Sequence, residues 1–177
     1  MKTMRLFLSV FLTVRKMQST NIVITHQNRC FGALVGVSDK YFAIKFDTGA
    51  SRTLISAELL TGILNDKQIK ALKDYCQSKQ IMPVPCVSAS GHKFDAYPAY
   101  INNICIGGHR FEKFYYYLVI DRLKNGRKIA LLGDDFIDCC GFSKEPHGNI
   151  VISGFDFKSY KNDQEKILTT EDISSII

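Results

Sequence analysis

Apolar and polar residues alternate over two neighbouring stretches in the first third of the chain. Residues 41–46 alternate in the way typical of a half-buried strand, and residues 30–37 also predict a strand. The polar residues Ser38, Asp39 and Lys40 separate the two stretches. This pattern predicts a β-hairpin whose second strand ends at Asp47.

Further along the chain, one clear helical pattern stands among several strand patterns. Asn65 can cap a helix with Gln68 three residues later, and Ile69, Leu72 and Cys76 then recur at helical spacing. A short helix-like run is expected at 57–60, and strands are expected at 99–106, 110–120, 128–133 and 149–153. The sequence therefore predicts a mainly β protein with one or two helices.

The acidic residue Asp47 directly follows the apolar strand 41–46. Burying an unpaired charge is costly, so a carboxyl in this place usually shares a proton or collects hydrogen bonds. Thr48 can supply a hydroxyl group, and Gly49 allows a sharp turn whose backbone N–H groups face the carboxyl. These residue types predict a carboxylate whose pKa is tuned by its surroundings.

The segment Asp47-Thr48-Gly49-Ala50-Ser51 resembles the active-site loop of the aspartic proteases, and its single copy resembles the retropepsin-like branch. The resemblance covers about residues 30–157. It implies a closed, folded β-sheet domain with a single lobe. It also implies a hydrolase, an aspartic-type endopeptidase, in which Asp47 is catalytic and no cofactor takes part.

Two distal segments extend this resemblance. Leu131, Leu132 and Gly133 match a family strand that passes beneath the catalytic loop, where glycine lets the two backbones come close. The runs 84–88 and 93–97 flank a small, glycine-containing tip and predict a hairpin. By position this hairpin matches the flap that closes over the substrate; its candidate flap residues are Ser88, Ala89, Ser90 and Gly91.

The single Asp-Thr-Gly motif bears on the assembly. Because this chemistry needs two carboxyls, the resemblance implies a symmetric homodimer with one Asp47 from each subunit. Asp134 and Asp135 could in principle supply a second carboxyl, but they are expected to cap a short helical turn. Ala50 stands where pepsin-type enzymes carry a hydroxyl residue, so we expect raised pKa values and activity at weakly acidic to near-neutral pH.

The amino-acid composition is typical of one soluble globular domain. The 177 residues are 46% hydrophobic and 23% charged, with a net charge of +6. The basic cluster 122–128 contains Asn125-Gly126 and is expected to be a solvated hairpin turn, so no nucleic-acid partner is expected. The six cysteines include no C-x-x-C pair, so they predict buried free thiols in a reducing cytosol and no metal site.

Both ends of the chain lie outside the resemblance. Residues 1–27 are expected to be an N-terminal extension, 28–157 the protease domain and 158–177 a C-terminal tail. The apolar run 6–14 is too short to span a bilayer and lacks a cleavage signal, which favours a cytoplasmic protein. Export or membrane association through this segment is the alternative, and the segment could also be a pro-segment or lie upstream of a natural start at Met17.

Three functional hypotheses follow. The first is a dimeric aspartic endopeptidase acting on protein or peptide substrates. The second is a retropepsin-like dimerisation or peptide-binding module without catalysis. The third, a nucleic-acid-associated protein, rests on net charge alone.

Overall fold

The computed structural model describes residues 22–27, 30–144, 149–153 and 166–177. Strands dominate this part of the chain, which confirms the predicted mainly β class. It also contains four short α-helices where one or two were expected, because α4 and α5 are too short to leave a clear periodic pattern. The predictions for residues 1–21 lie outside the described residues.

The elements follow one another along the chain as strands with short helices between them. The strands are β1 (Ile22–Gln27), β2 (Cys30–Val37), β3 (Lys40–Phe46), β4 (Leu54–Ser56), β5 (Val84–Val87), β6 (Lys93–Ile106), β7 (His109–Val119), β8 (Ala130–Leu132), β9 (Gly141–Lys144), β10 (Ile150–Ser153) and β11 (Leu168–Thr169). The helices are α2 (Ala57–Thr61), α3 (Asp66–Ser78), α4 (Asp134–Ile137) and α5 (Thr170–Ile176), with a 3-10 helix η1 (Lys124–Gly126).

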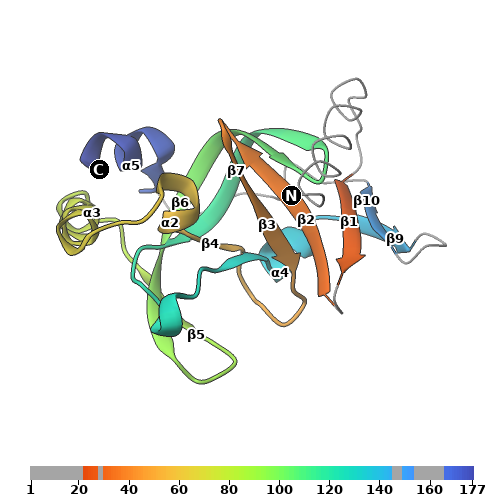
Figure 1. Ribbon diagram of the computed structural model, residues 1–177, viewed down its shortest axis with the longest axis horizontal. Helices are drawn as coiled ribbons and strands as arrows, with labels where there is room; N and C mark the ends of the chain where they lie inside the picture. Colours follow the sequence, from red (N-terminus) through yellow and green to blue (C-terminus); the bar gives the residue numbers. More distant parts are fainter. Residues whose placement is uncertain (1–21, 28–29, 145–148, 154–165) are drawn as a thin grey trace, which may run out of the picture.

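Six strands form a closed ring. The pairing order runs β6-β7-β4-β8-β3-β2, and β2 pairs with β6 again to close it. The predicted hairpin of β2 and β3 is confirmed, with Gly32 opposite Lys45 and Val37 opposite Lys40. Strands β1, β10 and β9 continue the sheet beyond β2 and lie at the opposite end of the molecule from α3 and α5 (Figure 1).

The interior of the ring is filled by aliphatic and aromatic side chains. Its largest fully buried members include Ile44, Ile55, Ile101, Ile104, Phe111, Phe114, Tyr116 and Phe136. The rings of Phe111 and Phe114 meet edge to face with their centroids 5.3 Å apart. Burying each such side chain contributes about 1.5–3 kcal/mol, so this core is the main source of stability.

A second, smaller apolar cluster lies where the β5–β6 hairpin leaves the body. It consists of Leu54, Phe94, Ala96, Tyr117 and Val119, with Val84, Cys86, Leu123, Ile129 and Leu131 packed against it. The cluster joins the hairpin to β4, β7 and β8. It therefore anchors the base of the hairpin, which projects from the molecule in Figure 1.

The end of the chain packs into the main core. Strand β11 pairs in parallel with β6, and Leu168 and Ile173 are buried in the main cluster. Helix α5 lies against α3, where the Tyr75 hydroxyl donates to Asp172 Oδ1 at 2.6 Å. Helix α3 begins with the predicted capping box of Asn65 and Gln68.

The basic segment 122–128 differs from expectation. It forms η1 rather than a hairpin turn, because β4 lies between β7 and β8 in the sheet and the two strands do not pair. Over the described ranges, no helix has both the length and the apolar composition needed to cross a bilayer.

Candidate functional site

The loop of residues 47–53 joins β3 to β4 and carries the Asp-Thr-Gly motif. The Asp47 N–H donates to the Leu132 carbonyl of β8 at 3.0 Å, which fixes the start of the loop beside that strand. The Ala50 N–H then donates to the Asp47 carbonyl at 3.1 Å and closes a tight turn. Asp47 is thus positioned by the backbone, at the point where β3 leaves the sheet.

The Asp47 carboxylate is accessible and has a cationic partner. Its side chain is 26% exposed, and Lys45 Nζ donates to Oδ2 at 2.7 Å. The Gly49 N–H donates to Oδ1 at 3.0 Å. The Lys45 ammonium lowers the pKa of Asp47; partial burial opposes this shift, and the Gly49 hydrogen bond adds to it.

The remaining motif residues surround this carboxylate with small side chains. A Cβ on Gly49 would lie 3.3 Å from Asp47 Oδ1, so a larger residue would crowd the carboxylate. Thr48 and Ser51 are exposed, and Ala50 is half-buried. Within the described part of the chain, the Thr48 hydroxyl has no hydrogen-bond partner, so it is available to another molecule.

Gly133 lies directly against the loop. A Cβ there would stand 2.4 Å from the carbonyl carbon and oxygen of Arg52 and 2.7 Å from the Ala50 oxygen. The Asp134 N–H donates to the same Ala50 carbonyl at 2.8 Å. Leu131 and Leu132 precede this contact in β8, which runs parallel to β3 with Leu132 opposite Phe46. The backbone at the end of β8 thus packs directly against the backbone of the Asp47 loop.

A buried hydrogen-bond network ties the far end of the loop to the same support. The Thr53 N–H and Oγ1 both donate to Asp135 Oδ1, at 2.8 and 2.7 Å, and the Gly133 N–H donates to Thr53 Oγ1 at 3.2 Å. Burial raises the pKa of Asp135, and the hydrogen bonds from Thr53 oppose that shift. The N-cap of α4 is Gly133, without a side-chain cap, so the expected capping by Asp134 or Asp135 is wrong. The Asp135 carboxylate binds the loop instead.

The candidate flap residues occupy the tip of the β5–β6 hairpin. Val84 to Val87 pair with Ala96 to Lys93, and the Ser88 N–H donates to the His92 carbonyl at 2.9 Å. Ala89, Ser90 and Gly91 are exposed at this tip, and Gly91 has φ of 78°, which favours glycine. The predicted hairpin is therefore present, with a small, polar end.

Sequence reasoning missed Lys45, Arg52 and Thr53. The signal for Lys45 was available, because side chains two residues apart on a strand lie on the same face. The Thr53–Asp135 contact joins residues 82 positions apart and left no local pattern. Among the described residues, no cluster of three His, Cys, Asp or Glu side chains could hold a metal ion.

No model of a known protein family matches the chain, and no curated protein matches it. Solved structures with a similar backbone arrangement include a retropepsin-like aspartic protease. That protein, from Rickettsia conorii, is 18% identical, and the match covers 75% of this chain and 89% of that chain with a TM-score of 0.41.

Proposed function

We propose that this protein is an aspartic endopeptidase that works as a homodimer, with the Asp47 carboxyls of two subunits sharing one water molecule. The observation that carries the proposal is the placement of Asp47. Its carboxylate is accessible at the end of β3, in a loop braced by Gly133 and by the Thr53–Asp135 contact. Such bracing is what a reacting group needs in order to keep its geometry.

The reaction would divide two roles between two identical carboxyls. One Asp47, ionised, takes a proton from the water as it attacks the peptide carbonyl, while the other, protonated, polarises that carbonyl. Two carboxylates about 3 Å apart cannot both ionise easily, so the pair shares a proton. The two apparent pKa values then belong to the pair.

Neighbouring groups would hold this pair. The Gly49 N–H fixes one oxygen of each carboxyl, and the free Thr48 hydroxyl can bond to the partner subunit's loop. Lys45 adds a positive charge that favours the ionised member of the pair. The β5–β6 hairpin would cover the substrate and exclude water from it.

The experiment is a cleavage assay on a peptide library with wild type, Asp47→Asn and the control Asp39→Asn, which changes an exposed aspartate in the β2–β3 turn. We expect cleavage by wild type and Asp39→Asn and loss of at least about 10³-fold in Asp47→Asn. Sedimentation should find all three chains as dimers. Equal cleavage by Asp47→Asn would refute the proposal.

One observation favours a second candidate, a non-catalytic dimerisation or peptide-binding module. The Lys45–Asp47 ion pair already satisfies the carboxylate within one subunit, which a purely structural loop would also use. In that case wild type and Asp47→Asn should bind the same peptides with equal affinity, and neither should cleave them at any pH.

A further inference from the structure

The side chain of Arg52 is held in place by Tyr117, and its charge also acts on the Asp135 carboxylate, where it opposes the rise in pKa that burial causes. It belongs to the same loop as Asp47 and is half-buried. Its Nη1 donates to the Tyr117 hydroxyl at 2.9 Å, and its guanidinium carbon lies 4.8 Å from the centre of the Tyr117 ring. In the described part of the chain no carboxylate forms an ion pair with it, whereas Arg122 pairs with both Glu58 and Asp66.

The guanidinium lies between the loop and the β5–β6 hairpin. Tyr117, which holds it, belongs to the second cluster that anchors the hairpin, together with Cys86 of β5. Burial raises the pKa of the Cys86 thiol; the Arg52 charge opposes this rise, and the Asp95 carboxylate adds to it. Arg52 thus links the Asp47 loop, to which it belongs, to the cluster at the base of the hairpin that carries the candidate flap.

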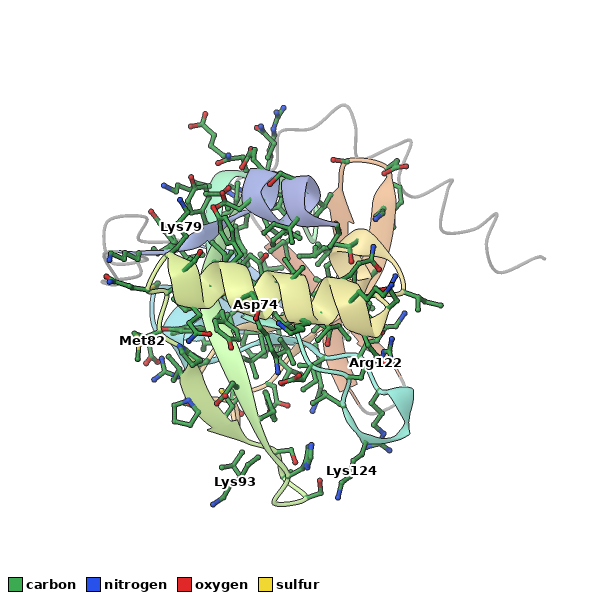
Figure 2. The ribbon with its side chains drawn as sticks, turned by 90° about the vertical axis from the view of Figure 1, so that its left-hand side faces the viewer. Asp74, Lys79, Met82, Lys93, Arg122 and Lys124 are labelled. Carbon is green, nitrogen blue, oxygen red and sulfur yellow. The ribbon has the colours of Figure 1, made fainter. Side chains whose placement is uncertain are left out.

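The end of the molecule around this hairpin carries further exposed cations. Lys93 starts β6 at the hairpin and Lys124 lies on η1, and Figure 2 shows both at the same end, away from Lys79 of the α3 region. Arg127 and Lys128 follow η1 and are exposed as well. Clustered charges of one sign raise the local concentration of ligands of the opposite sign.

We propose that Arg52 selects peptides that carry a glutamate or aspartate side chain close to the scissile bond. This inference rests on the proposed function, since it assigns a substrate class to the same site. Tyr117 uses one N–H group of a planar fork with five donors, and the others can bind a carboxylate through two parallel hydrogen bonds. Because Tyr117 already orients the guanidinium, little side-chain entropy is lost on binding.

The test compares libraries that are identical except for Glu, Gln or Lys fixed at one position near the cleavage point. Cleavage is measured with the active chain, and binding is measured by fluorescence anisotropy with Asp47→Asn. We expect a preference for Glu over Gln of at least about tenfold, which Arg52→Gln should abolish and Arg52→Glu should turn toward Lys. Arg110→Gln is the matched control and should keep the preference, because this exposed arginine at the start of β7 donates to Asn103 of β6, at the opposite end of β7 from Tyr117.

The outcomes separate this inference from the proposed function. Cleavage that depends on Asp47 but shows the same Glu preference in Arg52→Gln overturns the inference and leaves the protease. Arg52-dependent binding of Glu peptides without any cleavage supports the inference and overturns the protease. Arg52→Met keeps an apolar stem against Tyr117 and replaces Arg52→Gln if that variant does not fold. Absence of peptide binding and cleavage in wild type overturns both.

Discussion

Lys45 is the last residue but one of β3, and Asp47 follows the end of the strand, so the two side chains can meet on the same face of the sheet. The resulting contact sets the pKa of Asp47 in a single subunit, whereas the expectation based on Ala50 concerns the carboxyl pair of a dimer and stays a prediction. In a single subunit the Lys45 ammonium is the largest influence, and it lowers the pKa of Asp47.

The first prediction follows from this contact. Lys45→Gln should raise the pKa of Asp47, since the favourable charge is removed while burial remains. The acid limb of kcat/KM should move to higher pH, and NMR titration of the Asp47 carboxyl should show the same direction. Lys70→Gln removes a comparable lysine–aspartate pair on exposed α3 and should leave both curves unchanged.

The lowered pKa of Asp47 also determines how the contribution of the Lys45–Asp47 pair to the free energy of unfolding depends on pH. Because the folded-state pKa of Asp47 is lowered, the pair stabilises the fold above the ordinary carboxyl pKa of 3.8 and is lost as pH falls through the lowered value. The advantage of wild type over Lys45→Gln in unfolding free energy should therefore be present at neutral pH and vanish in strong acid.

Gly133 gives the second prediction. A Cβ at this position meets backbone atoms of Arg52 and Ala50, which cannot rotate away as a side chain can. We expect Gly133→Ala to lower the free energy of unfolding by about 3 kcal/mol, the upper end of the usual range for overpacking. Gly126→Ala, with open space but φ of 64°, should cost only about 1 kcal/mol. Urea denaturation of both variants checks this, and equal losses would contradict it.

At the scale of elements, the sequence predicted those whose signals are local. The β2–β3 hairpin, the capped helix α3 and the β5–β6 hairpin all follow from alternation, a capping box or a glycine-containing tip within a few residues. The hairpin turn predicted for 122–128 does not form, because Asn-Gly indicates a hairpin only when the two flanking strands pair with each other. That pairing depends on β4, about 70 positions earlier in the chain.

The residues of the candidate site likewise fall into those that a local motif predicts and those that only distant contacts bring together. Asp47, Thr48 and Gly49 are adjacent in sequence, so their chemistry could be predicted from the motif. The Thr53–Asp135 and Arg52–Tyr117 contacts join positions 82 and 65 residues apart. They arise only when β4 enters the sheet between β7 and β8, which no local pattern specifies.

Strand β11 and helix α5 supply the third prediction. Leu168 is fully buried beside β6, so Leu168→Ala should lower the free energy of unfolding by about 2–5 kcal/mol. Ile63→Ala, at a side chain that is 84% exposed, should change it by less than about 0.5 kcal/mol. Thermal or urea unfolding measures the difference. Similar values for the two variants would mean that the last strand is not part of the cooperative core.

At the scale of the whole molecule, one chain offers a single Asp-Thr-Gly carboxyl, so assembly should govern activity. We expect the specific activity per subunit to fall on dilution, along the same curve as the dimer fraction measured by sedimentation. Mixing wild type with excess Asp47→Asn should suppress cleavage, because mixed dimers hold only one carboxylic acid. Full specific activity in a monomeric fraction would rule out the shared site.

The placement of β11 also bears on limited proteolysis. Strand β11 pairs with β6 in parallel register, and Ile173 is buried in the same core. Removing residues 166–177 would therefore expose apolar core side chains to water and favour association between the truncated chains.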